Sequence, residues 1–223
     1  TYAASTAAGP AFEGSRLSCG MRATDGAIEK VVINENLEYD VIGGGAARGL
    51  CGSGLIDLVA ELIKQGVISP EGHLPREPDI PDTIPEHLCQ RIKVTEDGEK
   101  YFVVAEKDAE NGDTEVVLTQ ADIRELQLAT GAVRAGTQIL LKRAGLQQQD
   151  LTRVFIAGGF GSFIRRKQAQ RIGLLPPEID HRAITYVGNV SLSGAKWALL
   201  STKARNSAEK EAVDTEHMEL STD

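Results

Sequence analysis

Glycines are concentrated at a point where the chain could hold a flat ligand. Residues 154–157 form a short apolar run that leads directly into the segment Gly158-Gly159-Phe160-Gly161. At the carboxyl end of a buried strand, glycines let the backbone approach a ligand closely because no Cβ intervenes, and open α/β sheets bind ligands at such ends. The segment predicts a pocket for a nucleotide base and its ribose, with Phe160 or Phe163 as an apolar wall. The alternative is that the glycines only form a tight turn.

A second glycine-rich segment, Gly52-Ser53-Gly54, opens a predicted helix. Free N–H groups at a helix N-terminus attract anions, and Ser53 adds a hydroxyl group. The alternative is a simple capped helix start. The preceding run 43–49 (GGGAARG) lacks the G-x-G-x-x-G spacing, so a dinucleotide site is not predicted.

Glu13 is the one acidic residue in a segment of small residues, 7–14 (AAGPAFEG). It could act as an acid or base or orient a metal ion, or it could form an ion pair with Arg22. The four histidines show no ligand spacing, and the three cysteines contain no C-x-x-C pair. No metal site, iron–sulfur site or disulfide built from this chain alone is therefore predicted.

A basic cluster, Arg165, Arg166, Lys167 and Arg171, stands out in a chain with a formal net charge of −8. Such runs are usually solvated helix faces. Here the cluster could also hold nucleotide phosphates or dock an acidic partner. The acidic balance of the whole chain repels phosphate backbones, so a nucleic-acid partner is not predicted.

The composition favours a reducing compartment and a soluble chain. No apolar run in the 223 residues approaches the roughly 20 residues of a membrane span, and no signal peptide opens the sequence. A cytoplasmic protein without a membrane partner is predicted. The chain begins with Thr1 rather than Met, and both ends are expected to be cuts through a longer polypeptide.

In the first half of the chain, the spacing of apolar residues changes from a strand pattern to a helix pattern. Residues 27–33 and 37–42 predict a β-hairpin, and apolar residues at helical spacing after Gly52 predict a helix with Ser53 as N-cap and Gly66 as its stop. The proline-rich stretch 69–85 predicts an irregular excursion. Three short strands, 91–94, 101–105 and 115–118, joined by turns at Asp97-Gly98 and Asn111-Gly112, predict a small antiparallel insertion.

The second half predicts a long helix followed by parallel crossover units. Thr119 and Asp122 form a capping-box pattern at the start of this helix, which continues to Gly145. Gly131 and Gly136 within it each cost about 1 kcal/mol relative to Ala, so close packing against another backbone is expected at both. Two buried strands, 154–157 and 183–187, alternate with helices at 162–171 and 191–202.

The predicted organisation divides the chain into four parts. They are a first part of one α/β subdomain at 1–69, a proline-rich and β insertion at 70–118, a continuation of the subdomain at 119–203, and a polar tail at 204–223. The tail is expected to be solvated or poorly ordered.

Several segments, in this order and spacing, resemble the reductive activators of corrinoid proteins. They are STAAGPAFEG, GMRATDGAIEKV, GLCGSGLIDLVAELIKQGVI, DIRELQLATGAVRAGTQILL, VFIAGGFGSFI, RIGLLP and VGNVSLSGAKWALLS. The resemblance covers nearly the whole chain except about 70–115, and it implies an actin-like (ribonuclease H-like) ATPase fold of which this chain is most of the second subdomain. It also implies that the phosphate-binding loops of the D-x-G-T type and a two-iron ferredoxin domain lie outside this chain, because neither pattern occurs in it.

The resemblance assigns roles to residues at matching positions. Gly158, Gly159, Phe160 and Gly161 match the adenosine motif, whereas Gly52, Ser53 and Gly54 match the helix start that borders ribose and base. Glu13 lies in the turn near the interdomain cleft and is the candidate catalytic residue. The implied cofactor is ATP with Mg.

The activity implied by the resemblance is the ATP-dependent reduction of an inactive Co(II) corrinoid to Co(I). The implied partners are a corrinoid protein or corrinoid methyltransferase, an electron donor and, in a homodimer, a second copy. The sequence is also compatible with two alternatives. One is half of an actin-like small-molecule kinase, and the other is a non-catalytic fragment that keeps the fold.

Overall fold

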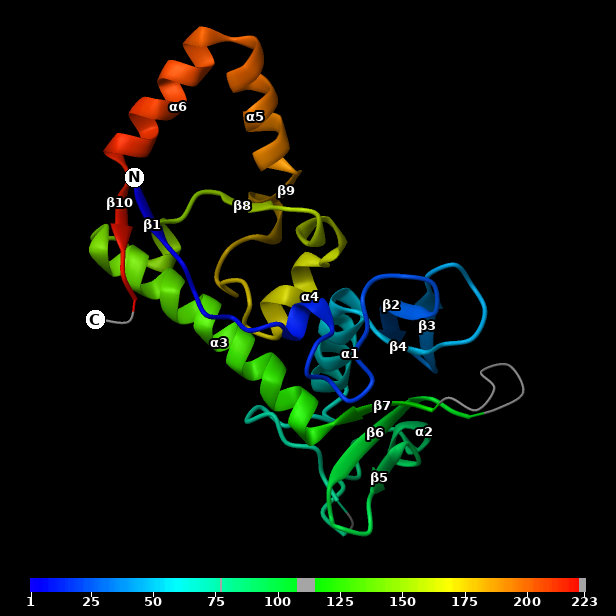
Figure 1. The fold of residues 1–223 in the computed structure, drawn as a ribbon. Coiled ribbons are helices and arrows are strands. Elements are labelled where there is room, and N and C mark those ends of the chain that lie inside the picture. The colour runs from blue at the N-terminus through cyan, green and yellow to red at the C-terminus, as the bar shows by residue number, and fades with distance from the viewer. Residues whose placement is uncertain (77, 108–114, 221–223) are drawn as a thin grey trace.

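The computed structural model describes residues 1–76, 78–107 and 115–220 and has the predicted α/β architecture (Figure 1). The strands are β1 (Tyr2–Ala4), β2 (Ala27–Ile33), β3 (Leu37–Val41), β4 (Gly49–Leu50), β5 (Ile92–Val94), β6 (Lys100–Ala105), β7 (Val116–Thr119), β8 (Val154–Ala157), β9 (Ile184–Gly188) and β10 (Glu216–Met218). The helices are α1 (Gly52–Lys64), α2 (Glu86–Cys89), α3 (Gln120–Arg143), α4 (Arg166–Arg171), α5 (Val190–Leu200) and α6 (Thr202–Asp214). The described strands form four small sheets, ordered β1-β10, β3-β2-β4, β5-β6-β7 and β8-β9.

The hairpin β2–β3 and helix α1 form the centre of the core. The strands pair antiparallel up to Ile33 and Leu37, which confirms the predicted hairpin. A Cβ on Gly54 would lie 2.1 Å from the Ile28 carbonyl oxygen, so only glycine lets α1 approach β2 this closely. The prediction that Ser53 is the N-cap is wrong: Cys51 holds that position, because α1 begins at Gly52, two residues earlier than a Ser53 cap would place it.

The small antiparallel insertion is confirmed by β5, β6 and β7. The Asp97-Gly98 turn is present, with Gly98 at a φ of +85° and its N–H donating to the Thr95 carbonyl. The Asn111-Gly112 turn lies outside the described residues. The described part of the stretch 69–85 contains no helix or strand, as its prolines predict.

Helix α3 begins with the predicted capping box. Thr119 accepts a hydrogen bond from the Asp122 N–H at 3.1 Å, and the Asp122 carboxylate accepts one from the Thr119 N–H at 2.9 Å. Close packing is found at Gly136, but against a side chain rather than a backbone: a Cβ there would lie 2.4 Å from Thr6 Cγ2. At Gly131 the prediction is wrong, because a Cβ there would meet no atom within 4 Å.

Strands β8 and β9 pair in parallel, and α4 lies in the connection between them, which confirms the predicted crossover. They are less buried than predicted: Ile184 at the start of β9 is buried, but Phe155 is 60% exposed, because these two strands form a separate sheet that little else among the described residues covers. The helix predicted at 162–171 is also shorter than expected. A 3-10 turn occupies Phe160–Phe163, and α4 starts only at Arg166.

The tail is solvated as predicted but is more ordered than expected. Helix α6 is followed by β10, which pairs in parallel with β1 beside the end of α3 (Figure 1). An ion pair of 2.7 Å between Arg143 and Glu216 joins β10 to α3. The sequence reading missed this pairing because it depends on two segments at opposite ends of the chain. None of the described helices is long and apolar enough to cross a membrane.

Candidate functional site

One cavity of about 890 Å³ collects three of the segments that the sequence singles out. It lies where the 7–14 turn, the start of α1 and the glycine turn after β8 meet. The residues that line it are Gly9, Phe12, Glu13, Met21, Arg22, Ala23, Glu29, Ile42, Cys51, Gly52, Ser53, Phe160 and Phe163. We call it the central cavity.

Close backbone contacts hold these segments together. A Cβ on Gly52 would lie 2.0 Å from the Phe12 carbonyl oxygen, so glycine is needed for the turn to reach the start of α1. A Cβ on Gly14 would lie 2.3 Å from the Met21 carbonyl oxygen, and its φ of +75° also favours glycine. The rings of Phe12 and Phe160 are 5.8 Å apart and join the turn to the glycine segment. The cavity wall is thus built from residues far apart in sequence.

The polar groups of the central cavity are few. Glu13, Glu29 and Arg22 bring two carboxylates and one guanidinium, and the Ser53 hydroxyl lies 3.3 Å from the Cys51 thiol. The ion pair considered for Glu13 and Arg22 is not formed in the described part of the chain. No side chain caps α1, so the first N–H groups of the helix at the cavity edge keep their capacity to bind a ligand.

The predicted site residues divide into two groups. Glu13, Gly52, Ser53 and Phe160 line the central cavity, and so does Phe163. The residues Gly54, Gly158, Gly159 and Gly161 are not among its lining. Gly54 packs on β2, and a Cβ on Gly161 would lie 2.6 Å from Ile156 Cγ2.

The glycine turn itself borders open space. A Cβ on Gly158 or Gly159 would have no atom within 4 Å, and Gly158 has a φ of +102° that other residues rarely adopt. The Gly158 N–H donates to the Gly188 carbonyl at 2.8 Å, which ties the turn to the end of β9. The turn is therefore fixed by the sheet while its outer surface stays accessible.

Sequence reasoning missed Glu29 as a cavity residue. The register of the β2–β3 pair shifts between Ile28 and Lys30, and such an irregularity re-aims the side chain within it. No local signal in the sequence marks this shift. Cys51 is buried, and it also contributes to the cavity wall.

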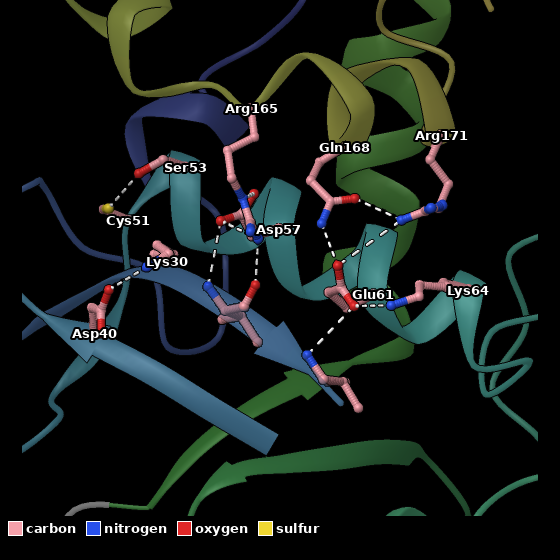
Figure 2. Close-up of polar contacts among 12 residues, drawn as sticks. Lys30, Asp40, Cys51, Ser53, Asp57, Glu61, Lys64, Arg165, Gln168 and Arg171 are labelled. Atoms are coloured by element: carbon pink, nitrogen blue, oxygen red, sulfur yellow. Dashed lines mark hydrogen bonds and ion pairs between the residues drawn. The ribbon is translucent and has the colours of Figure 1, made fainter. Parts of the chain in front are cut away.

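A buried polar network connects α1 with α4 and β2 beside the cavity (Figure 2). Asp57 on α1 forms an ion pair of 2.7 Å with Arg165 and accepts a hydrogen bond from the Val31 N–H at 3.4 Å. Burial raises the pKa of the Asp57 carboxyl, although Arg165 opposes this change. The Arg165 guanidinium also donates to the Val31 carbonyl.

One turn further along α1, Glu61 forms the second half of this network. It accepts hydrogen bonds from the Ile33 N–H at 3.4 Å and from the Gln168 amide, and Lys64 lies 3.4 Å away. Since Arg165 and Gln168 flank the start of α4, the network fixes the segment after the glycine turn against α1. The sequence gives no sign of it, because Asp57 and Glu61 read as polar positions of an ordinary surface helix.

Comparisons with known proteins agree with one another. A family model described as the C-terminal domain of RACo, the ASKHA domain, matches residues 1–223. The corrinoid activation enzyme RamQ of Eubacterium limosum is 39% identical over 224 residues, which cover 100% of this chain and 37% of that protein. A [Co(II) methylated amine-specific corrinoid protein] reductase of Methanosarcina barkeri is 27% identical over 220 residues, which cover 88% of this chain and 35% of that protein.

A solved structure of a reductive activator for corrinoid, iron–sulfur protein is also similar. It is 41% identical, the TM-score is 0.82, and the match covers 99% of this chain and 34% of that one. The chain thus spans little more than a third of the length of the relatives it matches.

Proposed function

Because the chain belongs to the family of the C-terminal ASKHA domain of RACo, we propose that it contributes the adenosine-binding part of an ATPase that reductively activates a corrinoid protein. The family and the actin-like fold expected from the sequence are both confirmed by the matches. The relatives carry names of corrinoid activation and corrinoid protein reduction, which supports the same activity here. The chain spans little more than a third of the length of those proteins, so the full activity is proposed only together with regions that correspond to the rest of them.

The observation that carries the proposal is the central cavity. Its wall is mainly apolar, with Phe160 and Phe163 presenting aromatic surface on which a purine can stack. Glu13 and Glu29 are carboxylates that can accept hydrogen bonds from ribose hydroxyl groups. The open space over Gly158 and Gly159 gives a flat ligand further backbone surface to lie on. A nucleoside thus fits the residues present.

In the proposed mechanism this chain binds the nucleoside, and binding changes the arrangement of the segments around it. When bound, MgATP supplies the free energy that the uphill reduction of Co(II) to Co(I) requires. Gly52 and Ser53 at the start of α1 border the ligand, and the Asp57–Arg165 pair connects α1 with the segment after the glycine turn. A nucleotide that binds one arrangement of these segments more tightly shifts the population toward it.

The remaining parts of the proposal concern the longer polypeptide. Glu13 faces the central cavity and is the candidate acid, base or metal-orienting group. The phosphate-binding loops and the two-iron cluster are assigned to regions outside this chain, because the sequence contains neither pattern. The corrinoid protein or methyltransferase, the electron donor and a second copy of the protein are the proposed partners.

The test is calorimetric titration of the chain with MgATP and MgADP. Phe160→Ala removes the aromatic wall and is expected to weaken binding about tenfold. Phe155→Ala, which removes an exposed ring outside the cavity, is the matched control and is expected to leave binding unchanged. Gly159→Val places a side chain in the open space that the flat ligand is proposed to occupy. It meets no protein atom there, so it should reduce binding without loss of fold.

Circular dichroism and thermal melting verify that each variant is folded. Equal effects of Phe160→Ala and Phe155→Ala would contradict an adenosine site in the central cavity. If the folded chain does not bind either nucleotide, it is a non-catalytic fold in isolation.

A further inference from the structure

A second groove, of about 640 Å³, shares the lining residue Phe163 with the central cavity. Five cationic side chains and a single carboxylate line it: Lys64, Arg165, Arg166, Lys167, Arg171 and Glu61. This composition inverts the charge of the chain, which has a formal net charge of −8. We call it the basic groove.

The internal ion pairs neutralise only part of this charge. Asp57 pairs with Arg165 at 2.7 Å, whereas Glu61 has Lys64 at 3.4 Å and Arg171 at 4.0 Å (Figure 2). Two carboxylates therefore face three of the cations. Within the described ranges, Arg166 and Lys167 form no ion pair, so the groove keeps an excess of positive charge.

Arg166 is fixed in place but not satisfied. Its guanidinium lies 5.0 Å from the centre of the Tyr186 ring, an arrangement that favours the cation and restricts its rotamers. The Tyr186 hydroxyl donates to the Ile164 carbonyl, which holds the ring. The Nε atom of Arg166 is buried and has no hydrogen-bond partner in the described structure. The internal contacts of the fold therefore leave part of this guanidinium without a hydrogen-bond partner.

We propose that the basic groove docks an acidic segment of a protein partner. The positive charges are distributed along α4 and across to the end of α1, which suits several carboxylates on a peptide better than one small anion. Arginine presents a planar fork that matches a carboxylate in a bidentate manner. Phe163, 63% exposed at the rim, offers an apolar contact beside the charges, as protein interfaces commonly do. This inference does not depend on the proposed ATPase function.

The experiment measures the fluorescence anisotropy of a labelled hexaglutamate peptide with the intact chain at low and at high salt. Hexaglutamate is expected to bind, and binding should weaken as salt rises. Neutral hexaglutamine should not bind. The double change Arg166→Glu and Lys167→Glu should weaken hexaglutamate binding about tenfold, since it reverses the two unpaired charges.

The matched control reverses two charges elsewhere. Lys203→Glu and Lys210→Glu change the net charge equally on the exposed helix α6 and should leave binding within about twofold of the original chain. Equal losses in the two double variants would overturn the proposal, because binding would then follow net charge alone. Failure of hexaglutamate to bind, or displacement of it by inorganic pyrophosphate alone, would also overturn it, the latter in favour of a phosphate site.

Discussion

At the scale of a single residue, two opposing effects act on the pKa of the Asp57 carboxyl. Burial in the core disfavours its charged form, whereas Arg165 at 2.7 Å and the Val31 N–H favour it. Burial is the larger effect, and the pKa of Asp57 is raised above its ordinary value of 3.8. The network therefore resembles other buried ion pairs, in which desolvation outweighs the attraction between the partners.

This balance predicts how stability depends on pH. A carboxyl whose pKa is higher in the folded state binds its proton more readily there, so its contribution to stability is present at low pH and is lost as pH rises through the folded pKa. Asp57→Asn cannot titrate. The free energy of unfolding of the original chain minus that of Asp57→Asn should therefore fall as pH rises from about 4 to about 8.

Urea unfolding at several pH values, followed by circular dichroism, measures this difference. Asp40→Asn on strand β3 removes an exposed carboxylate that pairs with Lys30 at the surface, and it serves as the control for a change in net charge. A difference that instead increases with pH would mean that the ion pair with Arg165 dominates over burial.

The residues that could be predicted from the sequence are those with a local signature. Gly52 and Phe160 were found because glycine clusters beside apolar runs are visible in the sequence, and both do line the central cavity. Glu29 could not be found, since its orientation depends on a register shift between two strands. Asp57 could not be identified as buried, because its burial depends on α4 arriving from more than a hundred residues away.

At the scale of the element, α3 contains two glycines in different surroundings. Gly131→Ala adds a Cβ into open space and should raise the free energy of unfolding by up to about 1 kcal/mol. Gly136→Ala places its Cβ 2.4 Å from Thr6 Cγ2 and 3.3 Å from Leu220, so it should lower that free energy by about 1 kcal/mol or more. Thermal and urea unfolding measure both changes.

A double variant tests whether the clash with Thr6 causes the loss of stability in Gly136→Ala. Thr6→Ser deletes the methyl group that a Cβ on Gly136 would strike. In the background of Thr6→Ser, Gly136→Ala should therefore cost less than in the original chain, whereas Gly131→Ala should keep the same effect in both. Equal costs of Gly136→Ala in the two backgrounds would contradict the packing seen here.

Elements specified by neighbouring residues were predictable, and those that depend on distant ones were not. The hairpin β2–β3 and the capping box of α3 are fixed within a few residues, and both were predicted correctly. The β1–β10 pair joins the two ends of the chain, so no local pattern could indicate it. The exposure of β8 could not be predicted either, because an apolar run does not reveal whether distant segments pack against it.

At the scale of the whole molecule, the apolar helix α5 has no buried residue. It packs with α6, and together they form an arch that leaves the rest of the fold and returns to it at β10 (Figure 1). Trp197, the one tryptophan of the chain, is 70% exposed, and Leu200 on the same helix is 83% exposed. Helices that are apolar on all sides are normally buried, so in the isolated chain this surface should promote association.

Replacing exposed apolar residues of α5 should therefore change association without changing stability. Trp197→Lys together with Leu200→Lys should alter the free energy of unfolding by no more than about 0.5 kcal/mol, because neither side chain is buried. Sedimentation velocity at increasing concentration should show less self-association than in the original chain. Leu62→Ala in the core of α1 is the contrasting variant and should cost about 2–5 kcal/mol. A comparable loss from the α5 double variant, or a Trp197 that acrylamide cannot quench in dilute solution, would mean that α5 is packed against the fold rather than exposed.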